Sequence, residues 1–163
     1  MHTLIKRALA LVLMLFIFTN VAAAQSATAT QTVTVAVNAI TLVSVTGTVT
    51  LTVLAGTAGE NILTAVTNGT TSYSITHNKG TVKKITAGIN SNLPSGIALK
   101  ATLTSTKGTS AGQQLLSTVA VDVVTAVAKG ADKDQPIAYE LTANADAGEL
   151  ASVVKTVTFT LTD

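Results

Sequence analysis

His77 has the side chain best suited to acid–base chemistry outside the N-terminal segment. The chain has two histidines, and the other one, His2, stands at the N-terminus. A catalytic triad needs a histidine held between an orienting acid and a nucleophile, yet no nucleophile-elbow sequence accompanies the serines and aspartates here. Because His77 ends an expected strand directly before a turn, we predict a solvent-facing residue at a strand edge, with no catalytic role.

Asp132 and Asp134 are the closest pair of acids in an expected loop. With Glu140 or Asp122 nearby in space, their carboxylates could supply oxygen ligands for Ca²⁺, which accepts flexible geometry. Lys133 stands between the two aspartates, and no ordered run ending in a glutamate follows them. A solvated charged turn is therefore the competing and favoured interpretation, and no cofactor is predicted.

The remaining motifs point away from an enzyme. Asn68-Gly69-Thr70 matches the N-glycosylation sequon, which matters only in a host that has the machinery. The glycines fall singly in expected turns and form neither a dinucleotide fingerprint nor a phosphate-binding loop. We predict a non-catalytic protein, and the competing class is a hydrolase that uses a scattered pair of carboxylates.

The N-terminus has the organisation of a secretory signal peptide. Lys6 and Arg7 precede an apolar stretch at 8–18, and Ala22, Ala23 and Ala24 supply the small residues that a signal peptidase reads. The stretch is shorter than the ~20 residues of a membrane-spanning helix, which is the alternative. We predict cleavage after Ala24, a secreted or cell-surface protein, and no membrane span in the mature chain.

Charge and cysteine content exclude several classes of partner. Without Lys6 and Arg7 the chain keeps eight lysines and no arginine against eight acids, so the predicted mature chain has no net charge. Nucleic-acid binding needs a basic patch, which this composition does not supply. Cysteine is absent, so disulfides and thiolate metal sites are excluded, and a core of Val, Ile, Leu and Ala must provide the stability.

Threonine and valine alternate along much of the chain, as in strands with one buried and one exposed face. The spacing of the strands and turns is typical of a sandwich, and no helical period alternates with it. Strands are expected over residues 32–37, 39–45, 48–53, 70–77, 82–89, 97–104, 137–143 and 155–162, with one long or two short strands over 115–127. Tyr73 and Ile75 are expected to point inward from 70–77, and Leu99 and Leu103 lie on the apolar face of 97–104. One side of 115–127 is expected to hold Val119, Val121, Val123 and Val127. Loops are expected over residues 55–69, 90–96, 107–113 and 129–135, with a tight hairpin turn at 78–80.

The last part of the chain is expected to close the fold as a hairpin. Apolar and polar residues alternate over 137–143 and again over 156–162, with a loop at 144–148 between them. This run resembles the last two strands of immunoglobulin-like domains, although the Cys pair and Trp of antibody domains are absent. The resemblance implies that Tyr139 is either the corner tyrosine of such folds or an ordinary core tyrosine.

These patterns together predict an all-β protein with a single antiparallel β-sandwich. The sandwich is expected to be immunoglobulin-like or fimbrial-like, with about eight or nine strands. The expected organisation is a signal peptide at 1–24, an N-terminal strand or donor-strand extension at 25–38, and the sandwich domain at 39–163.

The stretch 27–37 directs the functional interpretation. It carries no charge, and Val33, Val35 and Val37 lie on one face of the expected strand. It resembles the N-terminal extension of donor-strand-complemented pili, which implies a subunit that assembles into filaments by strand addition. Pilin subunits of that class lack their final strand, whereas residues 155–162 are expected to supply one here. The alternative is that the strand closes its own sandwich, and a monomeric adhesin or carbohydrate-binding module is the alternative function.

Overall fold

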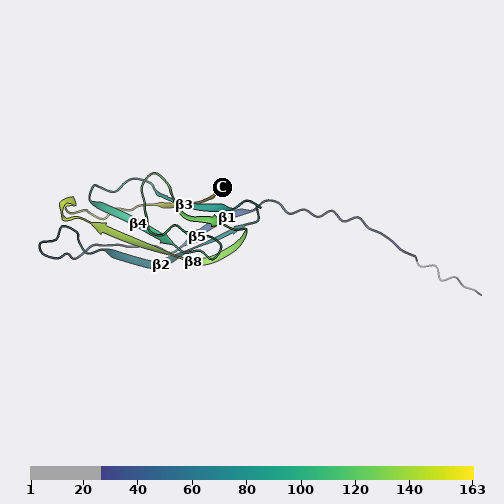
Figure 1. Ribbon diagram of the computed structural model, residues 1–163, viewed down its shortest axis with the longest axis horizontal. Coiled ribbons are helices and arrows are strands. Elements are labelled where there is room, and N and C mark those ends of the chain that lie inside the picture. Colours follow the sequence, from purple (N-terminus) through teal and green to yellow (C-terminus); the bar gives the residue numbers. More distant parts are fainter. Residues whose placement is uncertain (1–26) are drawn as a thin grey trace, which may run out of the picture. The chain divides into compact units, whose positions relative to one another are not determined.

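The computed structural model describes residues 27–163, so the expected signal peptide lies outside the described residues. The chain divides into two units, residues up to Ala36 and Val37–Asp163. In the first unit, residues 27–36 form no strand and their side chains are exposed. The second unit holds two antiparallel sheets (Figure 1). Its one helical element within the described residues is the short 3₁₀ turn η1 (Ala145–Ala147).

Nine strands make up the two sheets of the second unit. The first sheet has the order β1-β2-β8-β4-β6, and the second has the order β5-β7-β3-β9. Successive strands from β2 to β9 therefore alternate between the sheets. The bounds are β1 Thr41–Thr46, β2 Val66–His77, β3 Lys83–Ile89, β4 Ile97–Leu103, β5 Thr109–Ser110, β6 Gln114–Leu115, β7 Val121–Val127, β8 Gly130–Ala143 and β9 Val157–Thr162.

One apolar core is formed by side chains from both sheets, which confirms the predicted all-β, sandwich-like architecture. Alternation predicted its faces well: Tyr73 and Ile75 are buried on β2, and Leu99 and Leu103 are buried on β4. Because side chains alternate across a strand, their polar neighbours stand on the outer faces. The other buried apolar residues are Ile85, Ala87, Ile89, Ala101, Leu116, Val123, Val124, Val127, Ile137, Tyr139 and Leu161.

Both predicted hairpins are wrong in their pairing. The turn at 78–80 joins β2 to β3, which lie in different sheets, and the chain after 143 likewise joins β8 to β9 in the other sheet. β2 pairs with β1 and β8, whereas β9 pairs with β3. Alternation identifies the faces of a strand but not its neighbours, because pairing partners come from distant parts of the chain.

Parts of two expected loops belong to irregular strands. Residues 130–135, predicted as part of a charged loop, belong to β8, where the left-handed Asp134 (φ 53°) lies at a register shift against β2. Asn68 and Gly69, predicted as a turn, lie inside β2 at another register shift. A bulge of this kind inserts an unpaired residue into a ladder without ending the strand.

β7 departs from the predicted alternation for the same reason. Alternation in the sequence predicts that one side of this stretch holds Val119, Val121, Val123 and Val127. The structure buries Val123, Val124 and Val127 and exposes Val119, because the ladder with β3 shifts register twice and Ala126 is left-handed (φ 53°). An extra residue in a strand reverses the direction of every following side chain.

The segments before and after β1 do not form the strands predicted for them. Neither residues 32–37 nor 48–53 form a strand, although Val49 and Leu51 pack against the core and the alternate threonines at 48, 50 and 52 are exposed. Gly47 ends β1 with φ +91°, and a Cβ there would lie 2.9 Å from the Thr71 Cγ2. That position therefore requires glycine. Within residues 27–163 no helix has the length and apolar character needed to cross a membrane.

Candidate functional site

His77 is buried, which corrects the prediction of a solvent-facing residue. It is 1% exposed on the core side of β2, opposite Thr41 of β1 and Gly130 of β8. Neither ring nitrogen has a hydrogen-bond partner among the described residues. A general base needs an acid or a nucleophile within hydrogen-bond distance, and this environment provides neither.

Asp132 is also buried, at 2% exposure, which corrects the prediction of a solvated turn. Its carboxylate accepts hydrogen bonds from the Ser105 Oγ at 2.7 Å, the Thr106 N at 2.9 Å and the Thr106 Oγ1 at 2.7 Å, and a longer one from the Lys107 N at 3.3 Å. Burial alone would raise the pKa of Asp132, but these donors outweigh it and lower the pKa. The carboxylate therefore fixes the turn that follows β4.

The acids that could have joined Asp132 in a calcium site are not brought to it. Glu140 lies eight residues further along β8, roughly 26 Å away at the rise of a strand. Its carboxylate pairs with Lys100 at 3.0 Å, and Asp122 pairs with Lys84 at 3.2 Å. No group of three or more potential metal ligands occurs in the part of the chain that the structure describes.

Tyr139 is an ordinary core tyrosine, one of the two roles expected for it, whereas Tyr73 has a specific hydrogen-bonding role. The Tyr73 hydroxyl, not that of Tyr139, donates a hydrogen bond to a backbone carbonyl, that of Thr104, at 2.6 Å. Burial raises the pKa of both phenols to about 12, so both are neutral at physiological pH. Tyr73 thus fixes the end of β4 next to the turn that Asp132 holds.

Replacing Tyr73 by Phe should lower the free energy of unfolding by about 1 kcal/mol, because the Thr104 carbonyl loses its donor. The matched control is Tyr139→Phe. Its expected effect on the free energy of unfolding is within about 0.5 kcal/mol, because burial alone raises the pKa of Tyr139 and no hydrogen bond to its hydroxyl would be lost. Urea unfolding of the two variants checks the difference. Equal losses in both would contradict the assigned role of Tyr73.

Asn68 of the predicted glycosylation sequon lies within β2. Its Oδ1 accepts hydrogen bonds from the Thr70 N at 3.0 Å and the Thr70 Oγ1 at 2.8 Å. The amide side chain therefore stabilises the irregular part of β2 locally. Glycosylation at Asn68 stays a prediction.

The free edge of β1 is the feature with the clearest capacity to bind another chain. β1 pairs with β2 along one edge, and no described strand pairs with the other. All six of its residues are exposed, and no charged residue occurs between Ala27 and Gly59. Edge strands are commonly protected by lysine, proline or inward-facing charges, and β1 has none of these.

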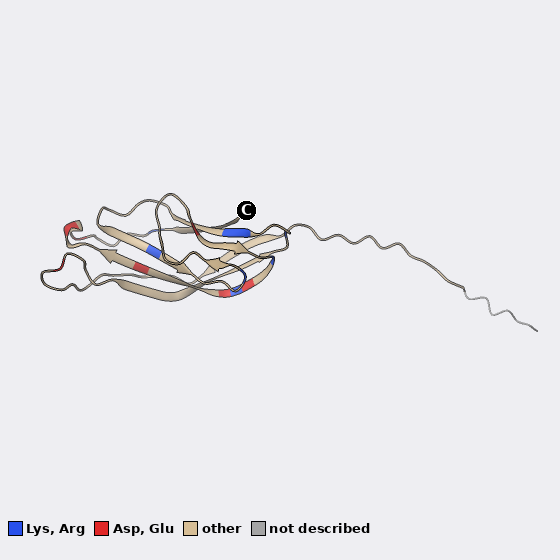
Figure 2. Ribbon diagram, in the orientation of Figure 1, with Lys and Arg blue, Asp and Glu red and all other residues tan. Residues whose placement is uncertain are grey.

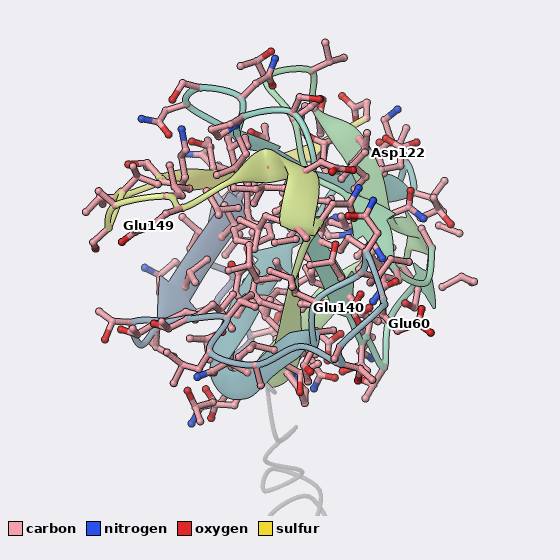
Figure 3. All side chains as sticks on the ribbon, turned by 90° about the vertical axis from the view of Figure 1, so that its left-hand side faces the viewer. Glu60, Asp122, Glu140 and Glu149 are labelled. Carbon is pink, nitrogen blue, oxygen red and sulfur yellow. The ribbon has the colours of Figure 1, made fainter. Side chains whose placement is uncertain are left out.

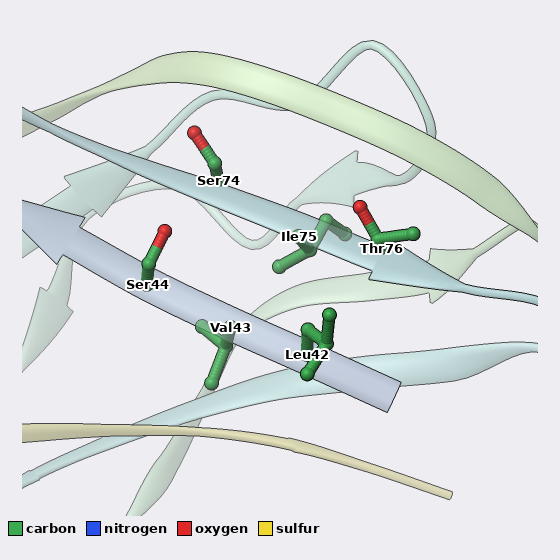
Figure 4. Close-up of a pocket in the computed structure, with 6 residues that line it drawn as sticks. All are labelled: Leu42, Val43, Ser44, Ser74, Ile75 and Thr76. Carbon is green, nitrogen blue, oxygen red and sulfur yellow. The ribbon is translucent and has the colours of Figure 1, made fainter. Parts of the chain in front are cut away.

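The core-facing side of β1 is only partly covered. Val43 and Val45 pair with the fully buried Ile75 and Tyr73, yet they are 36% and 44% exposed. Val43 and Ile75 point to one side of the strand pair, while Ser44, Ser74 and Thr76 point to the other (Figure 4). With Leu42, these residues line a hollow of about 320 Å³. Additional apolar chain could therefore bury surface at this edge.

Residues 27–37 have the complementary properties. Val33, Val35 and Val37 are largely exposed, and no described strand includes them. Each residue that the segment adds to a sheet edge would satisfy backbone groups and bury part of a valine. These valines are evident in the sequence but the acceptor is not, because the nearly continuous apolar run 39–45 predicts a strand without showing that it is an edge. The absence of charge up to Gly59 was the available signal.

The comparisons with known proteins leave the site to be interpreted from its own geometry. No protein family model, no curated protein and no solved structure matches this chain.

Proposed function

We propose that the chain is an exported, non-catalytic structural subunit that self-associates by β-strand addition. Residues 27–37 of one copy would pair with the free edge of β1 in another copy. The observation that carries the proposal is the exposed, uncharged edge of β1, with Val43 and Val45 incompletely covered. The immunoglobulin-like or fimbrial type of sandwich, the signal peptide and the cell-surface location remain parts of this proposal.

Strand addition suits these two segments on physical grounds. An added strand gains backbone hydrogen bonds along the edge, and alternate side chains enter the uncovered side of the sandwich. Each copy offers one donor segment and one acceptor edge, so the contact is head-to-tail and need not close on itself. Such contacts build filaments rather than dimers.

Deletion of residues 25–37 should abolish self-association and leave the sandwich folded, because neither sheet includes the described residues 27–37. We expect the chain that starts at Gln25 to assemble with rising concentration in sedimentation velocity, and the truncated chain to remain monomeric. Circular dichroism should show the same β-spectrum for both. A full-length chain that stays monomeric at every concentration, with a truncated chain that unfolds, would contradict the proposal.

A second variant tests the acceptor without changing the donor. Val45→Lys places a charge on the inward side of the edge strand, the device by which natural edges resist pairing. Assembly should be lost, whereas Thr50→Lys, a control on an exposed residue outside β1, should assemble normally. Normal assembly of Val45→Lys would show that the β1 edge is not the acceptor.

A further inference from the structure

The two ends of the sandwich carry opposite net charge. The first end, called the acidic end, consists of the loops 54–65, 90–96 and 144–156, which hydrogen bonds tie together: Leu63 N to Ala143 O, and Asn144 N to Gly96 O. It carries three acids and one lysine: Glu60, Asp146, Glu149 and Lys155. Viewed onto this end, Glu60 and Glu149 lie on opposite sides (Figure 3), so they form a spread surface rather than a chelating cluster.

The opposite end, called the basic end, consists of residues 77–83, 103–109, 127–134 and 162–163. These segments meet through the pairs His77 with Gly130 and Lys83 with Val127. Charged residues of both signs gather there, while red segments mark the loops on the left (Figure 2). The basic end carries five lysines and three acids: Lys79, Lys83, Lys107, Lys129, Lys133, Asp132, Asp134 and Asp163.

The excess charge at the basic end is available to a partner. Asp132 is saturated by hydrogen bonds within the chain, and Asp163 pairs with Lys83 at 2.6 Å. Lys79, Lys107 and Lys129 are exposed. Between the ends, the remaining charges cancel in the pairs Lys84–Asp122 and Lys100–Glu140. The sandwich therefore has two more acids than lysines at one end, and two more lysines than acids at the other.

Both ends also expose apolar side chains. Leu54, Ile62 and Val154 are 87%, 68% and 88% exposed at the acidic end, and Val82 is 64% exposed at the basic end. Apolar contact surrounded by complementary charge is the composition of protein interfaces. Because the two end charges are equal and opposite, a second copy of the chain is a complementary partner at either end, whereas contact between like ends is disfavoured.

We infer that copies of this chain stack end-on, with the basic end of one copy on the acidic end of the next. The inference deepens the proposed function, since it gives the self-association a direction. The chain enters the sandwich at the basic end, where the Asn78 Nδ2 donates to the Asn38 O. Stacking would thus bring the base of the donor segment, at Asn38, close to the neighbouring copy.

Charge reversal at one end tests the stacking in the full-length chain. Glu60→Lys with Glu149→Lys gives a copy with two basic ends, and Lys107→Glu with Lys129→Glu gives a copy with two acidic ends. Each variant alone should associate at least about tenfold more weakly than the parent, because like ends then meet. An equimolar mixture should recover association. The control exchanges a central pair, Lys100→Glu with Glu140→Lys, and should behave as the parent.

The outcomes separate this inference from strand addition. Parental association of both reversed variants, or a mixture no stronger than either alone, would overturn end-on stacking, whatever the deletion of residues 25–37 does. If the deletion leaves a weak association that the reversed variants lose and their mixture regains, stacking stands and strand addition fails. Raising the salt from 50 mM to 500 mM should weaken the end-on contact, because the Debye length falls below the spacing of the charges.

Discussion

Asp132→Ala should lower the free energy of unfolding by about 3 kcal/mol or more. The change leaves two backbone N–H groups and two hydroxyls of the 105–107 turn without their acceptor. Hydrogen bonds to a charged group are worth about 1.5–3 kcal/mol each, and unpaired buried donors carry a further cost. This loss is a large share of the roughly 5–15 kcal/mol that a domain has. Urea unfolding at pH 7 measures it.

Two further variants assign the effect to the carboxylate. Asp132→Asn keeps the side-chain volume and one acceptor oxygen, so its loss should be smaller than that of Asp132→Ala. Lys133→Ala, at the exposed neighbouring position, should stay within about 0.5 kcal/mol of the parent. Equal stabilities of Asp132→Ala and Lys133→Ala would show that the hydrogen bonds to Asp132 do not hold the turn.

The same carboxylate gives stability a defined pH dependence. The folded pKa of Asp132 lies below its ordinary value, because the donors of the turn favour the charged form. Its contribution is therefore present above the unfolded pKa of about 3.9 and is lost as the pH falls below that value toward the folded pKa. Between pH 7 and pH 3 the parent should lose more stability than Asp132→Asn.

The faces of the strands could be predicted from the sequence where alternation is unbroken. In β4, Leu99 and Leu103 are buried as expected, and in β2 Tyr73 and Ile75 are buried as expected. The sheet partners could not be predicted, because β9 pairs with β3, a strand some 70 residues earlier. Local sequence contains no information on such a pairing.

The burial of Asp132 and His77 also could not be predicted from the sequence. Asp132 has charged neighbours in the sequence, which is typical of a loop. Its hydrogen-bond donors come from residues 105–107, which precede β7 in the chain, so local sequence does not indicate them. His77 ends a strand directly before a turn, a position typical of an exposed residue, yet it is buried. Of the candidate site, the donor valines were evident in the sequence, while the acceptor edge needed the strand order.

Cross-linking between two single-cysteine chains should capture the donor segment on the β1 edge. The chain has no cysteine, so Val35→Cys in one preparation and Val43→Cys in another introduce one thiol each. Both positions are accessible in the isolated chain, and strand addition would bring them within several ångströms across a sheet edge. A short bis-maleimide reagent should therefore join the two preparations when they are mixed.

Three controls make the cross-link specific. Each variant treated alone should give far less dimer than the mixture, since thiols at matching positions of two copies do not meet in a donor–acceptor contact. Replacing Val43→Cys by Thr50→Cys, at an exposed residue beyond β1, should remove the product. Adding Val45→Lys to the Val43→Cys chain should also remove it.

The mixed cross-link is the most direct measurement of the central claim, which is that one copy donates residues 27–37 to the edge of β1 in another. The account predicts a product of two chains whose digest joins the Val35 position of one to the Val43 position of the other. A chain carrying both cysteines that links only within itself, together with no product from the mixture at any concentration, would contradict it.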